Sequence, residues 1–397
     1  MGKFIKKGLI IAGIVVVVLL LAAVVLYQTM GKISHTEPDS TPAPVEESGD
    51  KVLDAMHRGV EFLKLYQEED GHFSKGALDP KPAITAMVVD AILSVPHVSY
   101  EDSPYLQEAV QAIVDLQQPD GGFYTPRVPI GNYCTSVSLM ALARVDKEKY
   151  ADEIQDGIDY LLGIQKTDES DVQNLGGYGY MENSRADLSN TVMAIEALRE
   201  AGLPADHEAI QRATKFVTRC QNNSETNDLE WALNDGGFIY RPGESKAGEI
   251  TVDGKDGFRS YGIMSYAGFL SFVYADVGRE DPRVKAAMDW IRSNYTVNEN
   301  VNLGEAGLFY YYRLMSKALQ TAEIDKLRTE SGTVNWARDL SDKLISLQKD
   351  DGRWVNTNSQ WMEDDFVLVT AYCVKALSYC YRALNGLPSE IKTPNDL

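Results

Sequence analysis

The chain has 397 residues, of which 38 are Lys or Arg and 58 are Asp or Glu, so its formal net charge at pH 7 is −20. Hydrophobic residues make up 44% of it and cysteines only four positions. This composition supplies a large core and excludes a disulfide-stapled mini-domain, a collagen and a wholly disordered chain. The acidity also argues against nucleic acid as a partner, because phosphate binding needs a basic surface.

The N-terminus predicts a membrane anchor. Residues 8–27 contain no charged side chain, and a helix of this length rises ~30 Å, the thickness of the apolar layer of a bilayer. Lysines precede this run within residues 1–7, so the positive-inside rule predicts a cytoplasmic tip and an extracytoplasmic remainder at the cell (inner) membrane. A cleaved signal peptide is the alternative, but the run is longer than a usual signal core and no clear cleavage site follows.

A linker is expected after the anchor. Residues 28–50 are rich in Pro, Ser and acidic side chains and cannot bury enough surface to fold, which is typical of a flexible tether. The folded domain is predicted over residues 51–385, followed by a tail at 386–397. Four of the basic residues and none of the acidic ones lie in residues 1–32, so the rest of the chain carries a net charge of −24.

A motif of the form Gln-x-x-x-Gly-x-aromatic recurs along the predicted domain, each time after an amphipathic, helix-like stretch. Strict copies are Gln67-Gly71-Phe73, Gln117-Gly121-Phe123 and Gln348-Gly352-Trp354. Expanded copies begin at Gln165, with Gly177-Tyr178, and at Gln221, with Gly236-Gly237-Phe238. Most of these glycines follow an aspartate, which predicts a tight turn.

A second pattern follows these turns: an apolar stretch with a small or hydroxyl-bearing residue and a large apolar residue seven positions later. Its first members are Thr85, Thr135, Thr191, Ser265, Tyr312 and Thr370. Helices that are apolar on most faces are buried. Six units of an amphipathic helix, a glycine turn and an apolar helix therefore predict an all-α fold, an (α/α)6 barrel or toroid of about twelve helices.

The two patterns together resemble the prenyltransferase and squalene–hopene cyclase repeat superfamily, over residues 51–381. The segments 260–274 and 354–370 resemble a membrane-anchored bacterial subgroup of it. The resemblance implies the α/α-toroid fold. It implies little about chemistry, because the repeated motif ties helix ends together in this family.

The family's cyclases begin their reaction with a proton from an Asp-x-Asp-Asp-Thr-Ala motif, and the closest match here starts at Asp187 and reaches Thr191. The two later aspartates are replaced by Ser189 and Asn190, neither of which protonates an alkene. A Ser-Asn pair at this place is also typical of helix capping. Ordinary cyclase activity is therefore not expected.

Metal chemistry has no pattern to support it. In the family's protein prenyltransferases, zinc is held by Asp, Cys and His, but Val369 stands where the ligand histidine would align. The five histidines have no metal-type spacing, and Asp364-Asp365 is not followed by the residues of a magnesium-diphosphate motif. Neither a metal nor a cofactor is predicted, and whether the chain is an enzyme stays open.

Candidate site residues come from the starts of the predicted inner helices. Asp187 and Asp365 are the candidate catalytic carboxylates, with helix capping as the alternative role for the acidic stretch before residue 366. The candidate ligand-binding residues are Ser189, Asn190, Tyr133, Tyr261, Tyr266, Tyr311, Glu363 and Asp364. Aromatic side chains on inner helices line isoprenoid pockets in the family, although at helical spacing any single one of them more often belongs to core packing.

Two classes of function follow. The first is a membrane-tethered toroid that binds or modifies a lipid or isoprenoid in an aromatic-lined central cavity. The second is a toroid that binds carbohydrate or protein at the cell surface, either non-catalytic or with glycosidase-like chemistry, for which Asp187 and Asp365 would have to face each other ~5–10 Å apart. Fold alone does not decide between them.

Overall fold

The computed structural model describes residues 41–74 and 79–389. The predicted anchor at 8–27 and the first part of the predicted linker lie outside these residues. No helix in the described ranges has the length and apolar character needed to cross a bilayer. The first described helix, α2, begins at Lys51, and the last, α13, ends at Leu384.

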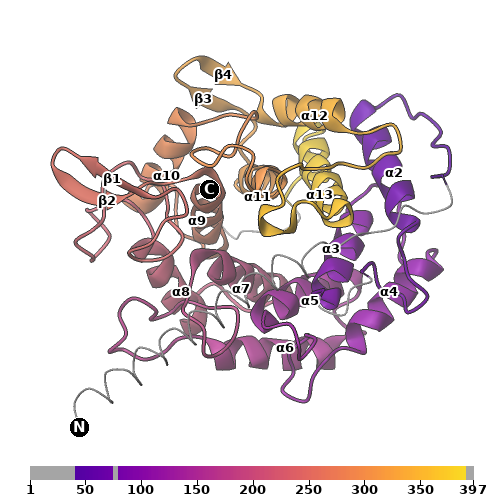
Figure 1. Cartoon of the computed structure of the whole chain (residues 1–397), viewed down its shortest axis with the longest axis horizontal. Helices are drawn as coiled ribbons and strands as arrows, with labels where there is room; N and C mark the ends of the chain where they lie inside the picture. Colours follow the sequence, from indigo (N-terminus) through magenta and orange to yellow (C-terminus); the bar gives the residue numbers. More distant parts are fainter. Residues whose placement is uncertain (1–40, 75–78, 390–397) are drawn as a thin grey trace, which may run out of the picture. The chain divides into compact units, whose positions relative to one another are not determined.

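Twelve α-helices of the described chain alternate between an outer and an inner ring (Figure 1). The outer helices are α2 (Lys51–Lys64), α4 (Pro104–Val114), α6 (Ala151–Ile164), α8 (Glu208–Arg219), α10 (Pro282–Ser293) and α12 (Trp336–Leu347). The inner helices are α3 (Lys81–Leu93), α5 (Gly131–Val145), α7 (Leu188–Ala201), α9 (Gly262–Tyr274), α11 (Leu308–Thr321) and α13 (Phe366–Leu384).

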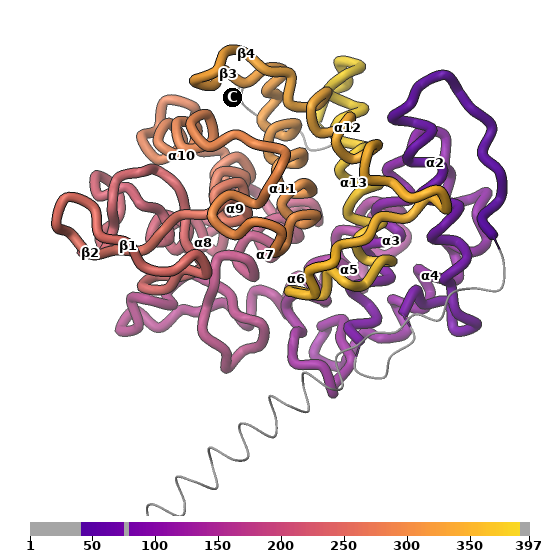
Figure 2. The backbone as a smooth tube through the Cα atoms, turned by 45° about the horizontal axis from the view of Figure 1, so that its top comes forward, coloured from indigo at the N-terminus to yellow at the C-terminus, as the bar shows by residue number. Residues whose placement is uncertain are grey.

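The inner ring is closed. Each inner helix packs against the next one along the chain, and α13 packs against α3 and α2, so that the last repeat lies beside the first (Figures 1 and 2). The prediction of an (α/α)6 toroid is confirmed. Four short strands in the described ranges form two hairpins, β1 (Glu249–Val252) with β2 (Lys255–Phe258) and β3 (Leu327–Thr329) with β4 (Gly332–Val334).

Hydrophobic pattern decides which ring a helix joins. All residues of α9 are buried, as expected for a helix that is apolar on every face. The outer helix α8 instead buries one stripe that includes Ile210, Ala213 and Phe216, while other faces carry charges. Aromatic and aliphatic side chains from both rings form one continuous core.

The repeated glutamine joins neighbouring outer helices. In five connections its side-chain Nε2 donates to two carbonyl oxygens at 2.7 to 3.1 Å, one in its own turn and one near the start of the next outer helix. The acceptors are Gly71 and Tyr105 for Gln67, Gly121 and Glu153 for Gln117, Gly176 and Ala209 for Gln165, Gly236 and Arg283 for Gln221, and Gly352 and Ala55 for Gln348. The last of these bonds links the sixth repeat to the first.

The repeated aromatic residue joins each turn to its inner helix. Its ring is fully buried, and its backbone N–H donates to the hydroxyl group that opens the second sequence pattern, at 2.9 to 3.2 Å. The pairs are Phe73 with Thr85, Phe123 with Thr135, Tyr178 with Thr191, Phe238 with Ser265, and Trp354 with Thr370. The two sequence patterns are therefore halves of one structural unit.

The connection between α10 and α11 departs from this rule. It lacks both the glutamine and the Ser or Thr side chain that accepts from the turn in the other repeats. Tyr312, the expected sixth member of the second pattern, uses its phenol hydroxyl as a donor to the carbonyl of Val297 at 2.7 Å. Asn300 links this loop to α9: its Oδ1 accepts from the N–H of Ile263 at 3.2 Å and its Nδ2 donates to Ala306 at 2.7 Å. An asparagine thus takes over the linking role in this repeat.

Candidate functional site

The six inner helices begin at the same end of the barrel. Asn132 at the start of α5 donates to Asn190 at the start of α7, and the loop before α13 reaches the start of α11 through Glu363. At the opposite end, Arg144 of α5 pairs with Asp90 of α3. The N-terminal end is thus also where the long motif loops gather, which is typical of a functional face.

Three tyrosines meet near this end of the axis. The hydroxyl groups of Tyr133 on α5 and Tyr372 on α13 are 3.3 Å apart, and the ring centroids of Tyr310 on α11 and Tyr372 are 5.6 Å apart. The Tyr133 hydroxyl also points at the sulfur of Met87, and that of Tyr310 at the sulfur of Met193. Tyr133 and Tyr310 are half-buried, although they belong to inner helices.

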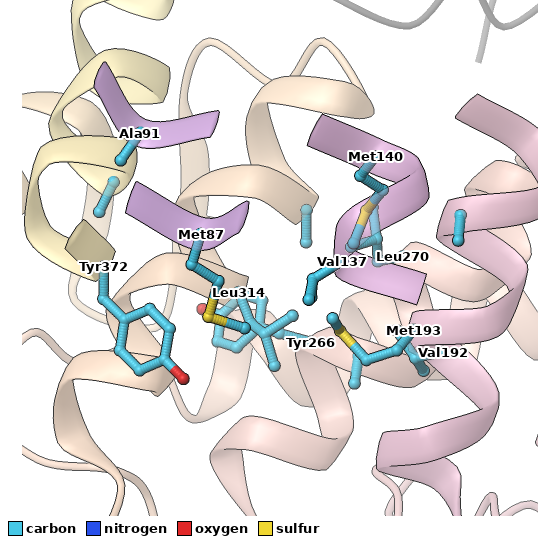
Figure 3. Packing of buried hydrophobic residues seen from close by; sticks show 14 of the residues in the cluster. Met87, Ala91, Val137, Met140, Val192, Met193, Tyr266, Leu270, Leu314 and Tyr372 are labelled. Carbon is cyan, nitrogen blue, oxygen red and sulfur yellow. The ribbon is translucent and has the colours of Figure 1, made fainter. Parts of the chain in front are cut away.

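Apolar side chains from all six inner helices surround this group. Figure 3 shows Met87 and Tyr372 near Leu314, with Val137 and Met193 beside them. Methionine adapts its shape at little cost and tyrosine combines an apolar ring with a polar tip. We call the set Tyr133, Tyr310, Tyr372, Met87 and Met193 the axial group, and its chemistry suits an apolar chain with a polar end.

A layer of charged side chains lies deeper in the barrel, about one to two helical turns beyond the axial group. Lys317 of α11 binds Glu196 at 2.9 Å and Glu200 at 3.0 Å, both on α7. Lys375 of α13 binds Asp90 at 3.0 Å. These pairings offset the high cost of desolvating the ions involved.

The residues that replace the cyclase motif act as a helix cap. Asp187 is buried at the N-cap of α7, where Oδ1 accepts from the N–H of Asn190 at 2.9 Å and Oδ2 from the Asn190 side chain at 2.9 Å. Burial raises the pKa of Asp187, while the hydrogen bonds from Asn190 lower it. Ser189 is half-buried, and it lies close enough to Tyr310 to lower the pKa of that phenol against the larger effect of burial, so Ser189 adjoins the axial group.

The acidic stretch before α13 also serves helix ends. Asp365 is fully buried at the N-cap of α13, where Oδ1 accepts from the N–H groups of Val367 at 2.9 Å and Leu368 at 3.1 Å. Its neighbour Asp364 is half-buried. The two candidate catalytic carboxylates, Asp187 and Asp365, thus cap different inner helices.

Glu363 caps a helix to which it does not belong. The N-cap of α11 is Gly307, which has no side chain to offer. Glu363 accepts instead from the N–H groups of Tyr310 at 2.7 Å and Phe309 at 3.3 Å, and from the side chain of Asn356 at 2.5 Å. Burial nevertheless raises the pKa of this carboxyl to about 7, against an ordinary value of 4.5.

The other candidate tyrosines lie in the packing between elements. Tyr261 is the buried N-cap residue of α9, and the rings of Tyr266 and Tyr311 contact each other with centroids 5.5 Å apart. The Tyr311 hydroxyl donates to the carbonyl of Thr296 at 2.8 Å, which turns it toward a loop. Successive helical residues differ by ~100° in direction, so of the adjacent tyrosines it is Tyr310 that belongs to the axial group.

Sequence reasoning missed the charged layer. The signal was present: Arg313 and Lys317 are four residues apart in one apolar helix, and Glu196 and Glu200 are four apart in another. Such spacing places each pair on one helix face, and the opposite signs match. Tyr372 was also missed, because nothing in the sequence singles it out among the apolar residues of α13.

Neither of two surface pockets contains a candidate residue. One has a volume of about 510 Å³ and is lined by the loop after α12, from Gln348 to Thr357, and the other, of about 560 Å³, lies over α2 and the segment 97–105. Within the described ranges no group of His, Cys, Asp and Glu has metal-binding geometry. The four cysteines are all buried and free.

These features define the class of protein: an α/α toroid whose repeats are joined by glutamine and glycine turns. Residues 74–241 match the family model of the squalene-hopene cyclase C-terminal domain, which confirms the resemblance drawn from the repeats. Among curated proteins, no sequence matches the chain.

Solved structures share the fold at low sequence identity. A variant of the type II terpene cyclase MstE from Scytonema, in complex with geranylgeranyl dihydroxybenzoate, is 13% identical, with a TM-score of 0.54 over 84% of this chain and 98% of that one. The GH76A alpha-1,6-mannanase of Salegentibacter sp. HEL1_6 is 10% identical, with a TM-score of 0.55 over 84% and 99%. A protein from Actinoplanes is 15% identical, with a TM-score of 0.53 over 84% and 100%.

Proposed function

We propose that this chain is a membrane-tethered toroid that binds an isoprenoid-like lipid at the axial group and does not carry out proton-initiated cyclisation. The observation that carries the proposal is the meeting of Tyr133, Tyr310 and Tyr372 with two methionines at the end of the axis. Two of the tyrosines are partly accessible there, which gives a ligand a surface to enter by. Aromatic and methionine side chains suit flexible apolar chains.

The expectation that the chain does not cyclise a substrate rests on the residues at the start of α7. The one carboxylate of the motif, Asp187, binds the backbone and side chain of Asn190, and its neighbours Ser189 and Asn190 carry no acidic proton at neutral pH. A proton donor for an alkene needs an acid that faces the substrate. The chain therefore keeps the toroid and an apolar axis without that acid.

Carbohydrate hydrolysis receives less support. The mannanase neighbour shares only the fold, and a glycosidase needs two carboxylates that face the sugar. Here Asp187 and Asp365 each accept hydrogen bonds from the backbone of their own helix. The anchoring part of the proposal rests on the uncharged run of residues 8–27 and the lysines before it.

Native mass spectrometry of the full chain in detergent, with farnesol as the probe, tests the binding. We expect one farnesol per chain, and we expect Ser189→Phe to weaken binding by about tenfold, because the added ring would compete with the ligand for contact with Tyr310. Ser346→Phe makes the same change on the exposed face of α12 and should leave binding unchanged. Failure of the wild-type chain to bind farnesol, or equal loss in both variants, would refute the proposal.

A further inference from the structure

Beyond the axial group, the buried charges of α7 and α11 form a quartet: Glu196 and Glu200 on α7 with Arg313 and Lys317 on α11. Lys317 contacts both glutamates at 2.9 and 3.0 Å. Two positive and two negative charges balance, so the quartet is neutral as a whole. Its geometry is nevertheless uneven, because Arg313 takes no part in these contacts.

Arg313 is a buried guanidinium without a hydrogen-bonded partner in the described structure. Its side chain is only 3% exposed, and among the described residues it makes no ion pair or side-chain hydrogen bond, while Nη1 is closed off from solvent. The groups that act on it electrostatically belong to Glu196, Tyr310, Tyr379 and Tyr133, and its central carbon lies 5.9 Å from the ring of Tyr372. These residues come from four inner helices, which places the guanidinium at the axis.

Glu196 has the complementary deficit. Its side chain is fully buried and Oε2 binds Lys317, but Oε1 has no hydrogen-bond partner in the described structure. Glu196 is also the largest electrostatic influence on Arg313 among the neighbouring groups. An unmet buried donor and an unmet buried acceptor each cost about 1–3 kcal/mol or more, so both atoms favour a group that satisfies them.

The chemistry of that group follows from the two deficits. It must accept from a guanidinium and donate to a carboxylate, and because the quartet is already neutral it need not carry charge. A hydroxyl group does both with one oxygen. Arg313 lies three residues after Tyr310 in α11, so a hydroxyl bound there would end a chain that lies in the axial group.

We infer that Arg313 and Glu196 bind the hydroxyl end of the ligand, so that the chain selects an isoprenoid-like alcohol over a hydrocarbon or an acid of the same length. This inference rests on the proposed function. It adds the polar end of the ligand and the residues that recognise it.

Native mass spectrometry of the full chain with farnesol, farnesene and farnesoic acid tests the inference, since the three probes share the chain and differ at its end. We expect farnesol to bind at least about tenfold more tightly than the other two, the usual consequence of leaving buried polar groups unmatched. Arg313→Met should reduce farnesol affinity to that of farnesene and leave farnesene binding unchanged. Arg338→Met, an exposed position on α12, is the charge control.

Thermal unfolding of the same variants without ligand, taken together with their selectivity, separates a binding role from a structural one. Because Arg313→Met leaves Glu196 and Glu200 with only Lys317 as a counter-charge, a lower melting temperature alone does not decide between the two roles, and the selectivity among the three probes does. A lower melting temperature with unchanged selectivity would overturn the inference and make Arg313 a structural residue. Equal binding of all three probes would contradict the inference about Arg313 and Glu196 but would agree with the proposed function. Binding of none of them would contradict both the inference and the proposed function.

Discussion

At the scale of single residues, the acidic side chains of this chain differ sharply in role although they look alike in the sequence. Asp187 and Asp365 cap their own helices, whereas Glu363 caps α11 from a different segment, where Gly307 offers no side chain. A cap on one's own helix can be predicted from sequence, because Asp before an apolar run is its signature. A cap supplied by another segment cannot, because it depends on tertiary structure.

Glu363 gives a prediction about pH. Its folded-state pKa of about 7 lies above the ordinary value of 4.5, so the folded chain holds a proton that the unfolded chain releases between these values. The contribution of protonated Glu363 to the free energy of unfolding is therefore complete below pH 4.5 and is lost as the pH rises through 7. The loss amounts to up to about 3 kcal/mol. Denaturant unfolding from pH 4 to 8 should show the wild type losing stability relative to Glu363→Gln across this window.

The exposed residue Glu330 supplies the control for this measurement. Glu330→Gln makes the same chemical change at an exposed side chain and is compared with the wild type at each pH. A constant stability difference between the wild type and Glu363→Gln from pH 4 to 8 would contradict the assignment.

At the scale of elements, the repeat is a joint between helices. Each repeated glutamine ties two outer helices, and each repeated aromatic residue ties a turn to the hydroxyl group of its inner helix, as Gln117 does with Glu153 and Phe123 does with Thr135. The two sequence patterns predict where each outer helix, turn and inner helix lies. They do not reveal that one hydrogen bond joins them, because that bond forms only when helix and turn are packed together.

The turn between an outer helix and the next inner helix requires glycine at its tight position, both for backbone conformation and for space. Gly121 has φ +87°, and a Cβ there would lie 2.3 Å from the carbonyl oxygen of Asp156 in α6. We expect Gly121→Ala to reduce the free energy of unfolding by about 2–4 kcal/mol, since both the strain and the clash must be relieved. Denaturant unfolding at neutral pH measures the change.

Gly163 is the matched control for this substitution. It lies inside α6, and a Cβ there would meet no atom within 4 Å. Gly163→Ala should therefore be neutral or stabilise the fold by up to about 1 kcal/mol, the difference in helix propensity. If the two alanine variants were equally stable, the joint would have no steric requirement for glycine.

At the scale of the whole molecule, a closed ring brings together residues that are remote in sequence. Gln348 of the last repeat binds Ala55 of the first, and Tyr372 meets Tyr133, 239 positions away. The ring itself can be predicted from six repeated units. Which tyrosine of the run 310–312 faces the axis is harder to predict, because Tyr310 shares a helix face with Arg313 and Lys317, and charged residues ordinarily mark the outward face of a helix.

The charge of the chain has two separate meanings at this scale. Beyond residue 32 the chain is strongly acidic, which would oppose contact with anionic lipid headgroups, so the membrane attachment that we propose would have to come from the apolar run at 8–27. Inside the ring, by contrast, Lys317 pairs with Glu196 and Glu200, and Arg313 brings the charge of the group to zero without forming an ion pair. In the proposed function, ligand recognition depends on the inner helices and membrane attachment on the N-terminal apolar run.

The central claim is that the ligand lies at the axis, and photolabelling tests it most directly. The full chain in detergent is irradiated with a diazirine analogue of farnesol, and the labelled peptides are identified by mass spectrometry, with excess farnesol as competitor. The account predicts competed labelling of α5, α11 and α13, near Tyr133, Tyr310 and Tyr372. Labelling confined to residues 8–27 or to the outer helices, or labelling that farnesol does not suppress, would contradict it.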